Sequence, residues 1–326
     1  TLSARTVLVN LQNGAETAVS AFEYPHGVMD KKIPSGRTLE KNSALQHPKD
    51  YLDAAEYTVR EVIRKSGADV DDVLGIGIDF TSCTMLPVDE KGNPLCFFNE
   101  FENEPHAYVK LWKHHAAQNE ANEITCFAKA EGEEWLDNYG GKISSEWMFP
   151  KILEIIHKCP EVYKKTARFI EAGDWVCSML TGKEIHSSCM AGFKGMWSKK
   201  NGYPSNDFLK KLHSEFDGIV GTKISKTIMQ PGASAGKLCK SGAELLGLSE
   251  NTVVSVPVID AHAALPAAGI TDGGKMMLII GTSTCHIMMS KTECMIDGIC
   301  GVVEDGIVPG LYAYESGQAC VGDLFG

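Results

Sequence analysis

The segment Val256–Ile270 constrains the fold more than any other part of the chain, because an apolar run, a carboxylate and a small-residue run follow one another there without a gap. The β-branched residues of its first part favour a short buried strand. The small residues of 261–268 favour a helix directly after that strand. In an open α/β sheet, ligands bind beyond the carboxyl ends of strands, so we expect Asp260 at the rim of a cleft. The simpler alternative is that Asp260 only caps the helix.

A second segment, Met276–Met289, predicts two apolar strands around a turn. The strands are Met276–Ile280 and Ile287–Met289, and the turn between them is made of Gly281, Thr282, Ser283, Thr284, Cys285 and His286. A turn rich in glycine and hydroxyl groups exposes N–H and O–H donors, which are the groups needed to hold phosphate oxygens. Taken alone, the turn is better explained as an ordinary hairpin. The carboxylate at a strand end about twenty residues earlier favours a phosphate-handling kinase.

The bulk properties exclude several classes of protein. At 326 residues the chain is too long for one ordinary core, so two domains, or one and part of a second, are expected. The formal net charge of -11 argues against a nucleic acid or an anionic membrane as partner. No apolar run approaches the ~18 residues of a membrane span, and the N-terminus lacks the pattern of a signal peptide.

The eleven cysteines contain no CxxC pair, which favours reduced thiols in a cytoplasmic protein over a disulfide frame or a zinc site. The chain begins at Thr1 rather than Met and stops at Gly326 just after a turn-like segment. We therefore expect it to be a fragment of a longer protein.

The N-terminal part predicts a hairpin, a helix and a strand in that order. Asn13-Gly14 separates two alternating β-branched segments and is a strong hairpin signal. Apolar residues recur on one helical face of Pro48–Ser66. Val73–Phe80 is an almost continuous apolar run, as expected of a central buried strand. This order is compatible with a ribonuclease-H-like α/β core whose first strand is missing upstream.

The segment after that strand holds candidate binding residues. Ser82 follows the strand and is expected at the same cleft rim as Asp260. Pro105–Gln118 is predicted to form a helix that carries Trp112, which either belongs to the core or offers a flat apolar face to a sugar. The adjacent His114 and His115 would point about 100° apart on a helix and would make a poor metal pair.

The middle of the chain adds a helix, a strand and a loop. Ser144–Lys158 predicts an amphipathic helix, and Arg168–Glu171 predicts a strand. Ser187–Trp197 is rich in glycine and small residues and predicts an irregular loop. Lys194, held between glycines in that loop, could reach into a cleft. The commoner alternative is a solvated surface lysine.

At these residues the chain resembles the FGGY carbohydrate kinases, and among them most closely the bacterial branch that phosphorylates L-ribulose. The resemblance covers nearly the whole chain, and its most specific parts are VPVIDAHAALPA, IGTSTCHIM, WMFPKILEI, AGFKGMW and YESGQACVGD. It implies an α/β fold of two ribonuclease-H-like (actin/Hsp70-type) domains that close over a sugar and MgATP. Residues 1–270 would then be the sugar-binding domain without its first strand, and 271–326 the start of a truncated ATP-binding domain.

The resemblance also implies roles for single residues. Asp260 would be the catalytic base, and Gly281–Thr284 the second phosphate loop. The positions expected to touch the ketopentose are Ser82, Trp112, Lys194 and Glu315. The chain departs from the family where the first phosphate loop would end at Thr1, and where Glu154 stands in place of a usual Trp.

The expected activity is transfer of the ATP γ-phosphate, with Mg²⁺, to the C5 hydroxyl of L-ribulose in L-arabinose catabolism. Three alternatives stay open at this point: another ketopentose or polyol such as D-ribulose or xylulose, a non-catalytic sugar sensor on the same fold, and a nicotinamide oxidoreductase. The last would need G-x-G-x-x-G after a strand, and Gly75–Asp79 gives it no support. The sequence leaves metal ligands and oligomeric state open, with a homodimer as one alternative.

Overall fold

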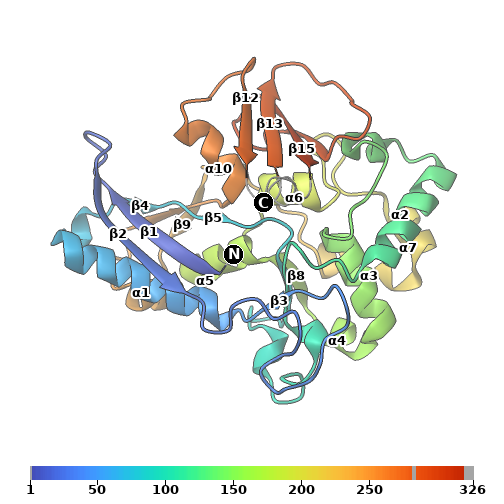
Figure 1. Cartoon of the computed structure of the whole chain (residues 1–326), viewed down its shortest axis with the longest axis horizontal. Helices are drawn as coiled ribbons and strands as arrows, with labels where there is room; N and C mark the ends of the chain where they lie inside the picture. The colour runs from blue at the N-terminus through green and yellow to red at the C-terminus, as the bar shows by residue number, and fades with distance from the viewer. Residues whose placement is uncertain (1, 281–283, 319–326) are drawn as a thin grey trace.

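The computed structural model describes residues 2–280 and 284–318, which form a mixed α/β structure (Figure 1). The chain opens with an antiparallel hairpin of β1 (Ser3–Val9) and β2 (Glu16–Glu23), and the predicted hairpin is confirmed. Gly14 adopts a φ of 74° in the connecting turn, a conformation that glycine reaches without steric cost. The hairpin packs on α1 (Lys49–Ser66), close to the predicted helix.

A four-stranded antiparallel sheet with the order β3-β7-β6-β8 lies in the interior. Its strands are β3 (Leu45–Gln46), β7 (Val109–Lys110), β6 (Met85–Val88) and β8 (Arg168–Glu171). Every residue of β6 is buried, so this strand is covered on both faces. The predicted strand at β8 is confirmed to the residue.

The prediction of one central buried strand over Val73–Phe80 is wrong. The segment forms two short strands, β4 (Gly75–Ile76) and β5 (Asp79–Phe80), and its residues are half-buried or exposed. β4 pairs with β10 (Val253–Ser255), which also pairs with β9 (Ser234–Lys237), and β5 pairs with β11 (Val258–Ile259). The apolar composition of Val73–Phe80 does not show whether other elements will cover both faces of the strand. Its two glycines, Gly75 and Gly77, also leave few side chains to pack.

The predicted helix over Pro105–Gln118 is also wrong. A single 3₁₀ turn (Pro105–Ala107) is followed by strand β7, and the next helix, α2 (Gln118–Glu131), begins where the predicted one should end. Residues 107–111 are all buried, and Lys110 pairs with both Leu45 and Met85. Pairing with two flanking strands outweighs the weak local preference of this segment for a helix.

The segment predicted as an irregular loop over Ser187–Trp197 contains a helix, α6 (Ser188–Lys194). The Ser187 hydroxyl caps it by accepting a hydrogen bond from the Cys189 N–H at 3.2 Å. Gly192 lies in the middle of α6 where a Cβ would come within 2.3 Å of Val303. The glycine that suggested a loop is therefore required by close packing between α6 and the strand β14 (Gly301–Glu304).

Helix α3 (Met148–Lys158) starts four residues later than predicted, and the predicted amphipathic pattern is confirmed. Its residues 148–156 are all buried, including Lys151 and Glu154. The remaining α-helices are α4 (Pro160–Lys165), α5 (Ala172–Thr181), α7 (Asn206–Leu212), α8 (Ile219–Thr222), α9 (Lys240–Leu246) and α10 (Asp260–Ala267). Among the described helices, none has the length and apolar character needed to cross a membrane.

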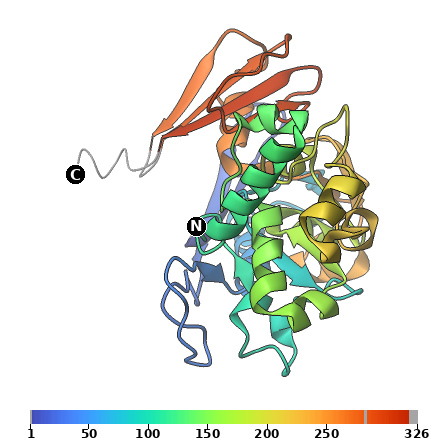
Figure 2. The same cartoon turned by 90° about the vertical axis from the view of Figure 1, so that its right-hand side faces the viewer.

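The C-terminal part forms a second antiparallel sheet with the order β12-β13-β15-β14 (Figures 1 and 2). Its strands are β12 (Met276–Ile280), β13 (Thr284–Ser290), β14 (Gly301–Glu304) and β15 (Tyr312–Gln318). The predicted hairpin is confirmed, with a longer second strand. An apolar cluster joins this sheet to α6 and α10, with Phe193, Leu265 and Ile287 at its centre. A domain boundary near residue 270 stays a prediction.

We expect Gly192→Ala to lower the free energy of unfolding by about 1–3 kcal/mol, because the added methyl group would overlap Val303 in a packed interface. Gly77→Ala is the matched control, since a Cβ there meets nothing closer than Ser255 Oγ at 3.9 Å. Urea denaturation of both variants measures the difference. Equal midpoints for the two variants would contradict the proposed packing of α6 on β14.

Candidate functional site

Asp260 lies where the sequence places it, directly after β11 and at the first position of α10. Its carboxylate accepts a hydrogen bond from the Ala261 N–H at 2.7 Å. Asp260 is exposed to solvent, but the surrounding protein removes part of its hydration, and this desolvation, with the nearby carboxylate of Asp79, holds its pKa above the ordinary value. Asp79 lies on the neighbouring strand, where it pairs with Val258.

Lys194 and Glu315 form a buried ion pair between α6 and β15. The Lys194 Nζ lies 2.9 Å from Glu315 Oε1, and Lys194 is only 5% exposed. Burial alone would lower the pKa of Lys194, but the Glu315 carboxylate outweighs it and raises the pKa. Burial opposes ionisation of Glu315 as well, yet Lys194 and His262 hold its pKa well below the ordinary value. The alternative of a solvated surface lysine is therefore wrong.

Cys285 links this ion pair to Asp260. Burial raises the pKa of the Cys285 thiol, and the charges of Glu315 and Asp260 raise it further while Lys194 opposes them. The three charged groups are thus close enough to act on one side chain. They come from α6, α10 and β15, which meet at one end of the C-terminal sheet (Figure 1). The structure brings together residues separated by 66 and 55 positions in the sequence, at 194, 260 and 315.

Ser82 and Trp112 lie on two segments that one buried lysine connects. The Lys151 Nζ donates to the carbonyl oxygens of Cys83 and Leu111, the latter at 2.9 Å. Each acceptor is adjacent in sequence to one of the two candidate sugar-binding residues. Cys83 has a φ of 56°, which is rare outside glycine and marks a tightly specified turn.

The surroundings of these two residues differ. Trp112 is half-buried and packs against the apolar core, which agrees with the simpler interpretation of that residue without excluding the other. Ser82 is half-buried at the turn, and the Lys194 charge acts on the adjacent Cys83 thiol. Ser82 is therefore near the ion pair, and contact of either residue with a sugar stays a prediction.

Glu171 was not predicted as a site residue. It ends β8, it is 2% exposed, and neither carboxylate oxygen has a hydrogen-bond partner among the described residues. Burial raises its pKa to about 7, although Lys151 and Lys194 both oppose the shift. A carboxylate at the end of a predicted strand is the same signal that singled out Asp260, and it could have identified Glu171.

Most of the expected phosphate loop cannot be placed. Gly281, Thr282 and Ser283 lie outside the described residues. Thr284 begins β13 and pairs with Ile280. The Thr284 hydroxyl is buried and has no hydrogen-bond partner within residues 2–280 and 284–318.

His114 and His115 do not lie on the helix from which their divergence was predicted, but one is buried and the other exposed. His114 is buried and lies 2.8 Å from Glu154, which also lies 2.9 Å from Lys110. Burial lowers the pKa of His114 to about 3, so it stays neutral beside the ion pair. His115 is exposed. Glu154, which stands where the family usually has Trp, therefore forms a buried ion pair with Lys110. It is far from Asp260 in the sequence.

Two groups of side chains in the described residues have the composition of a metal site: His26, His47 and Asp50, and Glu104, Cys159 and Glu161. In the first group, His26 Nδ1 is already bonded to Asp50 at 2.6 Å, and the two imidazole rings are stacked rather than convergent. In the second, burial keeps the Cys159 thiol protonated by raising its pKa to about 12. Neither group includes Asp260.

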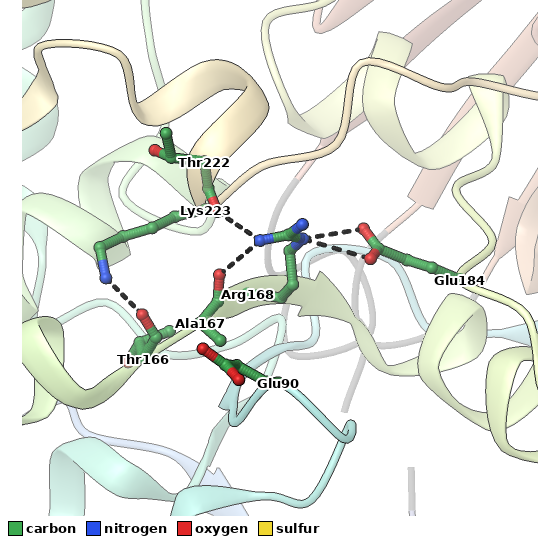
Figure 3. Close-up of a pocket in the computed structure, with 7 residues that line it drawn as sticks. All are labelled: Glu90, Thr166, Ala167, Arg168, Glu184, Thr222 and Lys223. Atoms are coloured by element: carbon green, nitrogen blue, oxygen red, sulfur yellow. Dashed lines mark hydrogen bonds and ion pairs between the residues drawn. The ribbon is translucent and has the colours of Figure 1, made fainter.

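A pocket of about 390 Å³ lies at the opposite end of β8 from Glu171 (Figure 3). Its two cations are occupied by protein acceptors: Arg168 lies 3.2 Å from Glu184 and donates to the Thr222 carbonyl, and Lys223 donates to the Thr166 carbonyl. These contacts hold the pocket wall together, and they leave little positive charge for a ligand.

We expect Glu171→Gln to stabilise the protein at pH 8 and to have little effect at pH 5. A carboxyl group whose pKa is higher in the folded than in the unfolded protein lowers the stability of the fold as pH rises from the unfolded pKa through the folded pKa of about 7. Glutamine does not ionise, so the variant escapes that loss of stability. The expected gain at pH 8 is about 1–3 kcal/mol. Thermal unfolding at both pH values tests this, with Glu250→Gln at an exposed position as control. A gain of equal size at pH 5 would refute the titration of Glu171.

Comparison with known proteins shows which sequences this chain resembles. Residues 276–326 match the C-terminal domain of the FGGY family of carbohydrate kinases. The chain is 48% identical to a ribulokinase of Bacillus licheniformis over 325 residues, and 50% identical to one of Shouchella clausii over 326 residues. These alignments cover 99% and 100% of this chain but only 59% and 58% of the relatives. The chain thus spans less than two thirds of the curated relatives it matches.

Solved structures give the same fold. The xylulose kinase of Rhodospirillum rubrum superposes with a TM-score of 0.82 at 20% identity, covering 99% of this chain and 60% of that one. The glycerol kinase of Plasmodium falciparum, solved with ADP, gives a TM-score of 0.75 at 16% identity over 99% of this chain and 60% of that one. The expected α/β fold of the ribonuclease-H-like, actin/Hsp70-type sugar kinases is confirmed. The chain belongs to the FGGY family of carbohydrate kinases.

Proposed function

We propose that this chain provides the sugar-binding side of a kinase that transfers the γ-phosphate of ATP to the C5 hydroxyl of L-ribulose. The observation that carries the proposal is the buried Lys194–Glu315 pair, whose charges act on the same thiol as Asp260 does. A charged donor and a charged acceptor held next to a carboxylate can orient the hydroxyls of a small polar sugar. Similarity to ribulokinases of about 48–50% identity supports L-ribulose as that sugar.

In this proposal Asp260 accepts the proton of the attacking hydroxyl. Phosphoryl transfer needs alignment and charge neutralisation more than covalent help, so one positioned carboxylate suffices. Lys194 and Glu315 bind and orient the neighbouring hydroxyls. Ser82 and Trp112 contact the remainder of the ketopentose, and the Trp112 ring helps to exclude water.

Fewer residues of this chain are proposed to bind ATP than to bind the sugar. The Thr284 hydroxyl, which has no partner among the described residues, would donate to a phosphate oxygen of ATP, together with Gly281, Thr282 and Ser283 of the loop before it. Bound Mg²⁺ would neutralise charge on the phosphates. Mg²⁺ prefers oxygen ligands, and the carboxylates of Asp79 and Asp260 fit that preference. No nucleic acid or membrane forms part of this proposal, and the protein is proposed to act in the cytoplasm.

We expect Asp260→Asn to lower kcat by about 10²–10⁴-fold while sugar binding changes little, because the amide cannot accept the proton. Asp272→Asn, at an exposed position twelve residues later, is the control. Release of ADP by the full-length protein is measured with L-ribulose, D-ribulose, D-xylulose and glycerol. Normal kcat in the Asp260 variant would refute the base, and glycerol as the best substrate would refute L-ribulose. Absence of turnover with every sugar would favour the sensor instead.

We expect Asp79→Asn to move the acid limb of kcat/KM to lower pH. Asp260 must be ionised to accept a proton, and its pKa is held up by burial and by the Asp79 carboxylate. Removing that negative charge makes Asp260 easier to ionise, so activity persists to lower pH. A pH–rate profile of the full-length protein measures the shift, with Asp72→Asn on the surface as control. An acid limb that stays in place or moves upward would show that Asp79 does not act on the base.

A further inference from the structure

His262 occupies an unusual position next to the proposed site. It lies two residues after Asp260 on α10 and is completely buried. Its Nδ1 lies 3.1 Å from Cys189 Sγ, and its ring centre lies 4.4 Å from that of Phe193. Both of these residues belong to α6, the helix that also carries Lys194. His262 is therefore the point where the helix of the proposed base rests on the helix of the proposed sugar-binding lysine.

The other side of the ring faces Glu315. His262 Nε2 lies 3.2 Å from Glu315 Oε2, but the two atoms are not aligned as a hydrogen bond. Neither atom has another hydrogen-bond partner among the described residues. Buried polar atoms are almost always paired, and bonds at active sites are often poorly aligned until substrate binds. Each atom is thus available to the other, and a small rotation of Glu315 would close the bond.

The protons can be assigned from the partners. Burial raises the pKa of the Cys189 thiol, so the sulfur keeps its proton and can donate it to Nδ1. A neutral imidazole that accepts at one nitrogen carries its proton on the other, so Nε2 bears the N–H, 3.2 Å from Glu315 Oε2. The opposite oxygen of Glu315 already accepts from Lys194. The sequence of contacts is Cys189, His262, Glu315 and Lys194.

We propose that His262 is a positioning residue for sugar binding: from α10 it holds the Glu315 carboxylate ionised and in the orientation that a sugar hydroxyl requires. This inference rests on the proposed function, because it deepens the role of Glu315 there. It also explains why the proposed base and the proposed sugar-binding acid keep a fixed relation, since α10 carries the first and contacts the second. Cys189 sets the ring by fixing which nitrogen bears the proton.

The other titratable groups near Glu315 do not compete with this role. Besides His262, Lys194 from α6 lowers the pKa of Glu315, through its charge and through a hydrogen bond. The thiols of Cys189, Cys285 and Cys300 have pKa values raised by burial and stay neutral. Loss of the His262 donor therefore leaves Lys194 alone to hold the carboxylate ionised.

Two variants of His262 separate the donor from the ring. His262→Phe keeps the contact with Phe193 but removes the N–H, whereas His262→Gln keeps an N–H in reach of Glu315. We expect KM for L-ribulose to rise about 10–100-fold in His262→Phe, with a smaller change in kcat, and His262→Gln to recover most of the loss. His286→Phe is the control, because His286 lies on the opposite face of β13 from Ile287, the residue that pairs with Glu315.

A second measurement needs no sugar. The carboxyl carbon of Glu315 is followed by ¹³C NMR in the full-length protein and assigned with Glu315→Gln. We expect the midpoint of its titration to move to higher pH in His262→Phe and to move less in His262→Gln. An unchanged midpoint together with an unchanged KM would overturn the inference. If the unmodified protein binds no ketopentose, the proposed function fails, and the titration alone decides whether His262 acts on Glu315.

Cysteine variants cover the case in which His262→Phe does not fold, as judged by circular dichroism. Cys189→Ala removes the donor to Nδ1, and Cys189→Ser restores a donor there. We expect a higher KM and a higher Glu315 midpoint in Cys189→Ala than in Cys189→Ser. Cys126→Ala, at an exposed thiol, is the control. Equal values for the two Cys189 variants and the control would overturn the inference in the same way.

Discussion

The buried charge pair between Lys194 and Glu315 is the interaction on which the arrangement of the site depends. Taking two charges out of water is costly, and only a close partner of opposite sign compensates for it. Removing one partner of such a pair usually costs about 3–5 kcal/mol, because the other is left charged and unpaired. The pair joins α6 to β15, so the C-terminal sheet and the preceding helices must meet at this place.

Several buried polar groups in the described residues have no hydrogen-bond partner. Glu171 has a carboxylate without a partner, His262 has a nitrogen without one, and Thr284 has a hydroxyl without one, all within the described residues. Each unsatisfied buried group carries a free-energy cost of about 1–3 kcal/mol. Such groups gather where ligands supply the missing partners, which is consistent with the sugar and phosphate roles proposed above.

Local patterns were reliable in this chain wherever one segment decided the outcome by itself. The hairpin around Asn13-Gly14, helix α1 and strand β8 were predicted closely because turn chemistry and periodicity act over a few residues. Predictions were wrong where distant segments decided. Val109–Lys110 became a strand because two other strands flank it, and α6 became a helix although Gly192 suggested a loop.

The candidate site shows the same division. Sequence alone identified Asp260 from its place after a strand, and resemblance to a family added Lys194 and Glu315. The sequence did not point to Asp79, Glu171 or His262, because the significance of each comes from a neighbour in the fold. These neighbours are the carboxylate of Asp260, the buried ammonium of Lys151 and the unpaired oxygen of Glu315, in that order. Those neighbours are far away in sequence, so no local pattern records them.

By itself, the sequence determined the type and order of most elements, the family, and the chemistry available at the ends of strands. The tertiary structure alone decided which of those groups meet, which are stripped of water and which are left without a partner. The physical reason is that propensity and turn chemistry are local properties of the chain. Charge stabilisation and desolvation depend on the distance between groups that only the folded chain brings together.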